Sequence, residues 1–411
     1  MEFERRCRQL LSTLVREANG VSFHVADANA PSVLSAWDSA HVALALRGSD
    51  PAAAAAELRA LYQACQRESG LVAGSRAFDA RARAALQAEL GPLFGEDERS
   101  ILIAPPVAAF AAAKLALAGG AAAARDLLTC ATRELDAIWG HRLPPDTSLP
   151  VILHPLESGH ARSALYDELV EQDTDEAWSE ESATLLRSAS ACQWDPERAL
   201  RAGHPFVIED PVFCGWLLLA LEACSQAWEK LGDTQVCLKL RIRSEMIAEG
   251  VASRLWWDEQ EIYVAWNRGR QGALRAVTAG GLVPAAVKSL VEEGTPKRAL
   301  DRHLRPGASP LWVAQGVSHR PIKRDERTST AVSGAEVSPL AAFWAHLALT
   351  RADRGPDARV ARTQLEELAV TRGLRASYAA AAEEADADPS DSSFWPALAL
   401  EMRALEGNGA K

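Results

Sequence analysis

Hydrophobic residues recur with helical spacing along most of the chain, and the segments that they define come in pairs. The spacing predicts helices over residues 30–46 and 50–68, 105–119 and 121–141, 209–232 and 233–256, 338–352 and 357–373, and lastly 394–406. Asp50-Pro51 and Asp210-Pro211 predict two helix starts, because Asp caps a helix and Pro suits its first position. Strand signals are sparse, and the alternating run 261–267 is the best of them.

The paired helices indicate a repeated αα-hairpin architecture. Many of them are apolar over much of their circumference, as expected of a layer that is packed on both sides. Successive pairs recur about every forty to fifty residues, which fits both an open superhelical solenoid and a closed α/α toroid. The connections between pairs differ greatly in length, whereas a solenoid would show more uniform repeats. We therefore expect an all-α toroid, with residues 1–411 forming a single domain.

Composition and charge narrow the class of protein. The 411 residues are 48% hydrophobic and 24% charged, which is ordinary for a globular chain with a sizeable core. A net charge of −11, without a long basic run, argues against general binding of nucleic acids or anionic membranes. The first twenty residues lack an apolar signal core, and the apolar run 212–224 is too short to span a bilayer, so we expect a cytoplasmic protein. The seven cysteines lack metal-ligand spacing and are interpreted as buried free thiols.

The long connections carry most of the candidate chemistry. They cover residues 140–159, 193–210, 256–282 and 306–334, and in a toroid they would build a shared rim on one face. Several of the twelve tryptophans lie in or near them, where their rings would stack on sugar C–H faces or simply pack in the core. The basic run 319–324 is either a lid over the rim or a solvated loop.

Four segments, taken in order, resemble one family of enzymes. They are the Trp37-Asp38-Ser39 segment (35–72), the Pro105-Pro106 segment (101–117), the His154-Pro155-x-Glu157-Ser158-Gly159 segment (154–169), and the Asp210-Pro211-x-Phe213 segment (206–222), which is followed by 255–266. In this order they resemble the six-hairpin (α/α)6 glycosidases. The nearest branch is the family-63 type, which includes mannosylglycerate and glucosylglycerate hydrolases and processing α-glucosidases. The resemblance covers most of the chain and implies the (α/α)6 toroid.

The same resemblance implies that the two catalytic carboxylates of the family are absent. The general acid would stand at position 161 and the general base at position 376, and both positions hold alanine here. Arg162 takes the place of an Asn, and Ala104 takes the place of a Gln. Inverting glycosidases need two carboxyl groups about 6.5–9.5 Å apart, so alanine at both positions predicts that hydrolysis by the family mechanism is lost.

The remaining candidates fall into two groups. For catalysis they are Glu157, Arg162, Asp167 and Glu336. For substrate binding they are Trp37, Asp38, His154, His160, Tyr166, Asp210, Trp256 and Trp257. Structural alternatives stay open for several of them: Asp210 as a helix cap, Glu157 as an acceptor for loop N–H groups, and Arg162 as an ion-pair partner of Asp167 or Glu157 rather than a holder of a carboxylate or phosphate.

We therefore expect an enzyme with a non-standard active site on a glycosidase fold. It would act on a small cyclic or polyol-like metabolite by cyclisation, isomerisation or elimination, and its Ala- and Arg-rich composition is typical of bacterial genes of high GC content, where specialised metabolism recruits such enzymes. Two alternatives are a true glycoside hydrolase with relocated acid and base residues, and a non-catalytic sugar-binding protein. The expected partner is a small-molecule substrate, with no cofactor, no metal, no nucleic acid and no membrane, in a monomer or homodimer.

Overall fold

The structure is a computed structural model of the chain. It describes residues 2–25, 29–90, 98–119, 124–171, 174–291, 294–306, 309–313, 315–321, 336–372, 378–379 and 394–408. Within these ranges helices dominate and the strands are short. The predicted all-α class is therefore confirmed.

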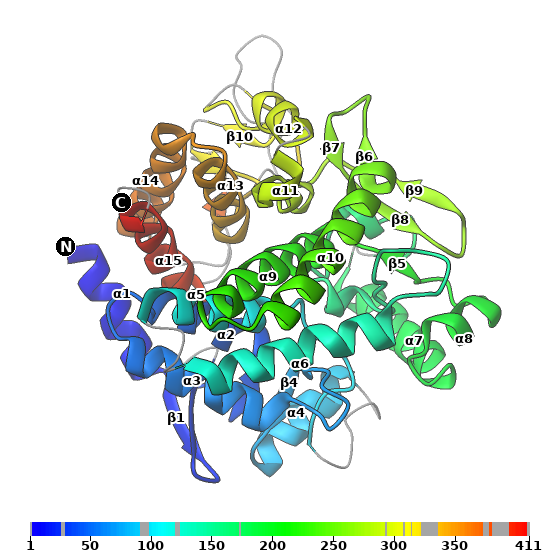
Figure 1. Cartoon of the computed structure of the whole chain (residues 1–411), viewed down its shortest axis with the longest axis horizontal. Coiled ribbons are helices and arrows are strands. Elements are labelled where there is room, and N and C mark those ends of the chain that lie inside the picture. Colours follow the sequence, from blue (N-terminus) through cyan, green and yellow to red (C-terminus); the bar gives the residue numbers. More distant parts are fainter. Residues whose placement is uncertain are drawn as a thin grey trace.

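Six elements form an inner ring, in which each contacts the next. They are α2 (Ala36–Leu46), α5 (Val107–Gly119), α9 (Pro211–Lys230), the paired 3-10 turns η6 (Ala279–Leu282) and η7 (Pro284–Ala286), α13 (Pro339–Arg351) and α15 (Phe394–Asn408). The last of these, α15, packs against α2 again, so the order of contacts returns to its start. Figure 1 shows α2, α5 and α9 near the middle of the molecule.

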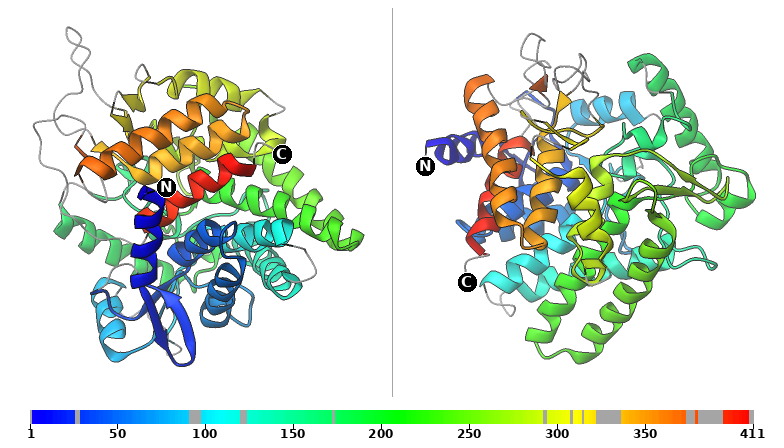
Figure 2. Two further views of the ribbon diagram at one scale, coloured as in Figure 1. Left: turned by 90° about the vertical axis from the view of Figure 1, so that its left-hand side faces the viewer. Right: turned by 90° about the horizontal axis from the view of Figure 1, so that it is seen from above.

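A second layer of helices lies outside the ring. It contains α3 (Pro51–Cys65), α6 (Arg125–Arg142), α10 (Thr234–Gly250), α12 (Thr295–His303), α14 (Gly355–Arg372) and α1 (Glu2–Thr13). The first five pack against the inner element that precedes them, and α1 packs against α15. The two terminal helices thus lie side by side (Figure 2). Six inner and six outer elements make the expected (α/α)6 arrangement, with short 3-10 turns in the place of the fourth inner helix.

The other elements lie in the connections. They are the helices α4 (Ala80–Leu90), α7 (Asp175–Ala191), α8 (Pro196–Arg201) and α11 (Lys288–Val291), the 3-10 turns η3 (Pro155–Glu157) and η4 (Ala164–Tyr166), and the π-helical turn η5 (Val251–Leu255). The strands form antiparallel pairs: β1 (Val15–Ala18) with β2 (Val21–His24), β3 (Val33–Ser35) with β4 (Ser75–Ala77), β6 (Trp256–Trp257) with β7 (Ile262–Tyr263), β10 (Trp312–Val313) with β11 (Gly316–Val317), and β12 (Glu336–Val337) with β13 (Tyr378–Ala379). A three-stranded sheet joins β5 (Ile208–Glu209), β8 (Ala265–Asn267) and β9 (Gly272–Leu274).

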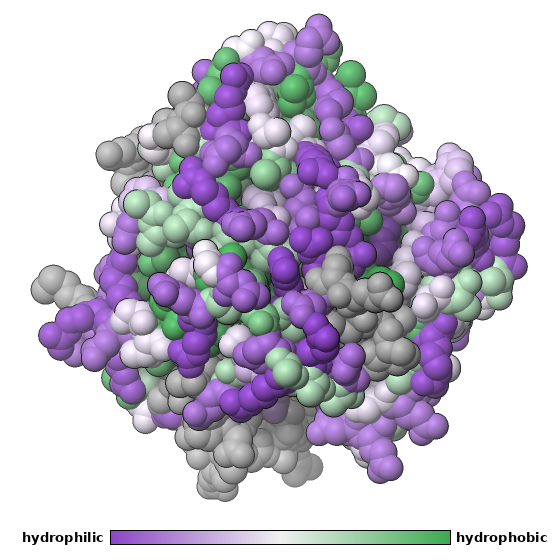
Figure 3. Space-filling model, turned by 90° about the horizontal axis from the view of Figure 1, so that it is seen from below, coloured by the Kyte–Doolittle hydropathy of each residue, from purple (hydrophilic) through white to green (hydrophobic). Residues whose placement is uncertain are grey.

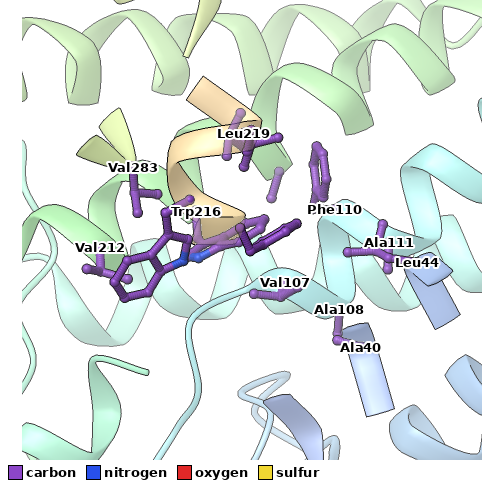
Figure 4. Close-up of a cluster of buried hydrophobic side chains, with 14 of the residues drawn as sticks. Ala40, Leu44, Val107, Ala108, Phe110, Ala111, Val212, Trp216, Leu219 and Val283 are labelled. Atoms are coloured by element: carbon purple, nitrogen blue, oxygen red, sulfur yellow. The ribbon is translucent and has the colours of Figure 1, made fainter. Parts of the chain in front are cut away.

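The hydrophobic core fills the space between the inner elements. Figure 4 shows Trp216 of α9 among apolar side chains that come from α2, α5 and the start of η7. The turn η7 comes very close to α9, because a Cβ at Gly215 would lie 2.8 Å from a methyl group of Val283 and 3.0 Å from the Pro284 nitrogen. Glycine at position 215 therefore allows short turns to take the place of an inner helix. By contrast, the face in Figure 3 is mostly hydrophilic, with small separate hydrophobic areas.

Several predictions about elements need correction. The helix predicted from residue 30 begins at Ala36, because Val33–Ser35 pair with Ser75–Ala77 as a strand. The run 261–267 forms parts of two strands, β7 and β8, and the connection 193–210 contains the short helix α8. Asp50 and Asp210 cap α3 and α9 as predicted. All seven cysteines are free thiols, and all except Cys130 are buried. In the part of the chain that the structure describes, no helix is long and apolar enough to cross a membrane.

Candidate functional site

The amino-terminal ends of the inner helices meet on one face of the ring. An outer helix lies between consecutive inner elements in the sequence and packs against the inner element before it. In αα-hairpins of this kind the outer helix returns, so we expect the inner helices to run in the same direction. Ser35, Asp210 and Ser338 cap α2, α9 and α13 by accepting a backbone N–H with their side chains. Helix dipoles make such a face favourable for carboxylates and for acceptor oxygens of a ligand.

Trp37 and Asp38 lie in the first turn of α2, and both are half-buried. The Trp37 ring stands edge-on to His41 and Trp216, with centroid distances of 4.9 and 6.2 Å. Another neighbour of Trp37 is Gly159, where a Cβ would lie 2.7 Å from the indole. Gly159 also has a φ of +75°, so both its conformation and its space favour glycine. The 154–160 turn therefore brings its backbone directly against Trp37.

The Asp38 carboxyl has a raised pKa. Burial raises its pKa to about 6, and the neighbouring His41 and the Ser35 hydroxyl oppose this rise only partly. The residue as a whole is half-buried. Its role as a site residue stays a prediction.

His160 packs against two residues that come from much later in the chain. Its ring stacks on His319 at 4.0 Å, and both imidazoles stand edge-on to Trp344 of α13 at 5.6 Å. His319 Nε2 and Ser338 Oγ form a hydrogen bond of 2.6 Å. Burial lowers the pKa of His160 to about 4, and it also lowers the pKa of His319, so the stacked rings are neutral at pH 7. We call Trp37, Asp38, His160, His319 and Trp344 the central cluster.

Glu157 points away from the central cluster and is fully buried. Its carboxylate accepts two hydrogen bonds from Arg142, at 2.6 and 3.2 Å, and one each from the backbone N–H groups of Ile103 and Leu153. Four donors saturate a carboxylate, so this geometry favours the structural alternative for Glu157 over the catalytic one.

His154 is equally enclosed, as the cap of the turn η3. Its Nδ1 accepts the Leu156 N–H at 3.2 Å, and its Nε2 faces the Ser182 carbonyl oxygen at 3.2 Å. Burial lowers its pKa to about 3, so His154 is a neutral side chain. In this geometry His154 orients the turn rather than a substrate.

Tyr166 and Asp210 form a buried pair. The Tyr166 hydroxyl donates a hydrogen bond of 2.7 Å to Asp210, whose other carboxyl oxygen caps α9 through the Phe213 N–H at 2.8 Å. Burial raises the pKa of Asp210 to about 6 and raises that of Tyr166 further above its usual range. The interpretation of Asp210 as a helix cap is confirmed.

Three of the predicted catalytic residues lie on the surface. Arg162 pairs with Asp175 at 2.6 Å and covers the Trp178 ring, so its partner is neither Asp167 nor Glu157 as the structural alternative had it. Asp167 accepts a hydrogen bond of 3.3 Å from Arg320. Glu336 is exposed at the start of β12. Position 376 lies outside the described residues.

Trp256 and Trp257 belong to the β6–β7 hairpin. Their indole N–H groups donate to Asp258 at 3.2 Å and to Glu259 at 3.0 Å, within the same hairpin. Arg298 and Arg275 lie over the two rings. These contacts tie both tryptophans to their own hairpin and to neighbouring arginines rather than to the central cluster. Their part in substrate binding stays a prediction.

A model of one protein family matches most of the chain. The model of the mannosylglycerate hydrolase MGH1-like glycoside hydrolase domain matches residues 32–309. The chain belongs to this family. The match includes Trp37, Asp38 and the 154–160 turn, whereas Trp344 and Ser338 lie beyond it.

Solved structures agree with this family. The family-63 mannosylglycerate hydrolase of Thermus thermophilus, in complex with glucose, is 18% identical, with a TM-score of 0.75 over 99% of this chain and 100% of that chain. The complex of the same enzyme with Tris and D-glycerate has a TM-score of 0.76 over 97% of this chain and 99% of that chain. Neutral trehalase Nth1 of Saccharomyces cerevisiae is 14% identical, with a TM-score of 0.55 over 94% and 76%. At these identities the likeness shows the fold, and no curated protein sequence matches the chain.

Membership of the mannosylglycerate hydrolase MGH1-like family leaves the roles of single residues open. Ala161 follows His160 directly and is half-buried, so it is positioned beside the central cluster. The loss of the acid and the base to alanine stays a prediction.

Sequence reasoning missed Trp344, Ser338 and Arg142 as neighbours of the predicted site. Of these, only Ser338-Pro339 carried a signal, that of a helix start. Among the described residues, no group of three or more His, Cys, Asp or Glu could hold a metal ion.

Proposed function

We propose that this member of the mannosylglycerate hydrolase MGH1-like family converts a small cyclic or polyol-like molecule at the central cluster. The reaction is a proton transfer, as in isomerisation, elimination or cyclisation, with Asp38 as its acid and base. Hydrolysis by two opposed carboxylates is not the chemistry that we infer. The proposal treats the glycosidase fold as a scaffold on which a different reaction takes place.

The observation that supports this proposal is the environment of Asp38. Of the described carboxyl groups whose pKa is raised, Asp38 alone keeps partial exposure, whereas Glu134, Glu209 and Asp210 are buried. A general acid or base works best when its pKa lies close to the working pH. One such group can remove a proton from one atom of a substrate and return it to another, which is sufficient for isomerisation.

The surroundings of Asp38 support a polyol-like substrate. Trp37 offers an aromatic ring, on which the C–H face of a small ring compound can stack. The neutral His160 and His319 offer ring nitrogens rather than charges. The carboxylates predicted for catalysis do not support a hydrolytic pair with Asp38, since Glu157 is saturated and Asp167 and Glu336 are exposed on the surface.

Deuterium incorporation tests the proposal. The protein is incubated in D2O with a panel of aldoses, ketoses and cyclic polyols, and proton NMR follows the loss of C–H signals and the formation of products. We expect turnover of at least one compound, and a loss of about 10²–10⁴-fold in rate for Asp38→Asn. Glu134→Gln is the matched control, because that carboxyl also has a raised pKa, about 8, but bonds Tyr62 outside the central cluster.

Two other results would replace the proposal. Release of nitrophenol from nitrophenyl glycosides, or cleavage of mannosylglycerate or glucosylglycerate, would establish a true hydrolase with relocated carboxylates. Thermal stabilisation by a sugar without turnover of any compound in the panel would establish a sugar-binding protein. In both cases Asp38 would lose the role that we assign to it.

A further inference from the structure

A cleft that is lined by described residues lies away from the central cluster. Its volume is about 440 Å³, within the range of about 300–1,000 Å³ that is usual for small-molecule sites. Four segments line it: residues 67–71, 101–103, the end of α6 at 140–144, and the turn 193–197 between α7 and α8. It shares no lining residue with the central cluster. We propose that this cleft binds a neutral, hydroxyl-rich small molecule of mono- or disaccharide size, and this inference does not depend on the role of Asp38.

The backbone around Trp194 is the first observation that points to a ligand. Gln193 and Trp194 both have a φ of +56°. At Gln193 this is a usual end of a helix, because the N–H groups of Gln193 and Trp194 bond carbonyl oxygens of α7, but at Trp194 it is a left-handed conformation that bulky residues rarely adopt. Glycine would take this conformation without strain, yet the chain keeps a large indole here. Such strained positions concentrate at ligand-binding sites, where the fold holds a side chain in a required place.

The indole itself supplies the second observation. Trp194 is half-buried and packs between two small hydrophobic clusters, one around Leu102 and Leu186 and the other around Val151 and Leu153. Its Nε1–H is buried without a hydrogen-bond acceptor among the described residues. Buried donors are normally satisfied, and this N–H belongs to a side chain that lines the cleft, so it needs an acceptor that the described residues do not supply. A ligand hydroxyl oxygen is an acceptor of this kind.

The lining of the cleft selects the class of ligand. Two of its charged side chains have ion-pair partners outside the lining, Glu157 for Arg142 and Arg201 for Glu197. The other two, Arg67 and Asp195, have opposite charges, so the lining favours no net ionic charge. Guanidinium groups donate hydrogen bonds and carboxylates accept them, and a hydroxyl group can meet both. The apolar walls come from leucine, isoleucine and proline side chains, namely Leu71, Ile103 and Pro196. Donors, acceptors and apolar walls together match a saccharide, which has hydroxyl groups around apolar C–H faces.

The cleft and the central cluster lie on two sides of the 154–160 turn. Two residues that line the cleft, Ile103 and Arg142, donate hydrogen bonds to the Glu157 carboxylate. Gly159, in the same turn, lies directly against the Trp37 ring. Binding in the cleft can therefore be measured separately from binding at Trp37, with a probe on each side of the turn.

Fluorine NMR of protein labelled with 5-fluorotryptophan makes this measurement. The chain has twelve tryptophans, and the variants Trp194→Phe and Trp37→Phe assign the two resonances of interest. The probes are D-glucose, D-mannose and trehalose, with sodium phosphate as a charged comparison. We expect a saturable shift of the Trp194 resonance with at least one sugar, and none with phosphate.

Three variants locate the binding. Ser69→Phe places a ring at the exposed edge of the cleft and is expected to weaken the Trp194 response about tenfold or more. Ser179→Phe is the matched control, an exposed serine of α7 outside the lining, and Asp38→Asn tests independence from the central cluster. Both are expected to keep the response. A Trp194 resonance that does not move with any sugar, that moves equally in Ser69→Phe, that is lost in Asp38→Asn, or that moves only with phosphate overturns the proposal.

Discussion

His160 and His319 stack face to face, with ring centroids 4.0 Å apart and planes inclined by 27°. The contact joins two connections that are far apart in sequence, the 154–160 turn and the segment around β11. Ser338 lies next to this contact, because its hydroxyl group forms a hydrogen bond with His319 and also caps α13. Two stacked imidazoles are compatible only while at least one of them is uncharged, because two imidazolium rings at this distance repel each other. The geometry of the central cluster thus depends on pH.

Acidification is expected to destabilise the protein through His160. Its pKa is about 4 in the folded protein, below the ordinary value of 6.5. Between these two pH values His160 binds a proton in the unfolded chain but not in the folded protein. The free energy of unfolding therefore falls as the pH drops from 6.5 to 4. The loss amounts to at most about 3 kcal/mol. His160→Gln should reduce the difference between urea unfolding free energies measured near neutral pH and near the folded-state pKa. An unchanged difference would contradict the neutral stack.

The Asp38 carboxyl is expected to have the opposite effect on the pH dependence of stability. Its pKa of about 6 lies above the ordinary value of 3.8, so the folded state favours the protonated carboxyl. The stability that this carboxyl contributes is complete below pH 3.8 and is lost as pH rises to 6. Asp38→Asn should therefore stabilise the protein above neutral pH, by up to about 3 kcal/mol, and have little effect at about pH 4. Chemical denaturation at the two pH values measures this, and a destabilised variant above neutral pH would show that the charged form has partners that stabilise it.

The sequence is most informative where a signal is local. Asp50-Pro51 and Asp210-Pro211 predict helix starts that the structure confirms, because a cap involves residues only a few positions apart. The start of α2 was predicted too early, because the competing strand partner Ser75–Ala77 lies some forty residues away. The order of the family motifs predicted the fold.

The candidate site was harder to predict, for the same reason. Arg142 and Glu157 are distant enough that only the fold brings them together, and the pair turns a predicted catalytic residue into a buried ion pair. Arg162 likewise forms its ion pair with Asp175 rather than with the carboxylates that are nearer in sequence. His160 was predicted as a site residue, but its contact with two aromatic rings depends on three separate elements of the ring of helices.

Removal of the Glu157 charge is expected to weaken the fold. Glu157→Gln leaves the Arg142 guanidinium buried without its anion, and loss of one partner of a buried pair costs about 3–5 kcal/mol. Asp126→Asn, which breaks the exposed ion pair with Arg59, is the control and should cost less than about 1 kcal/mol. Urea unfolding at neutral pH measures both. A Glu157→Gln variant with full stability but no activity would restore the catalytic interpretation of this residue.

Asp167 and Glu336 are expected to be dispensable. Both are exposed, and the ion pair of Asp167 with Arg320 lies at the surface, so each replacement by alanine should change the unfolding free energy by less than about 0.5 kcal/mol. Activity in the polyol panel should stay within about twofold of wild type, because neither carboxylate has a place in the central cluster. The double variant is the decisive measurement. If it abolishes turnover while Asp38→Asn does not, the reaction uses relocated carboxylates.

Gly159 is expected to determine the position of Trp37. An alanine there would bring a Cβ within 2.7 Å of the indole, in addition to the cost of a φ of +75°. Gly232 has the same φ, but nothing lies within 4 Å of its Cβ position, so Gly232→Ala measures the backbone cost alone, about 1–2 kcal/mol. Gly159→Ala should cost more than this, should shift the Trp37 fluorine resonance, and should reduce ligand binding at the central cluster. Equal costs for the two variants would mean that the 154–160 turn can retreat from Trp37, and that the close contact is not required to hold the indole in place.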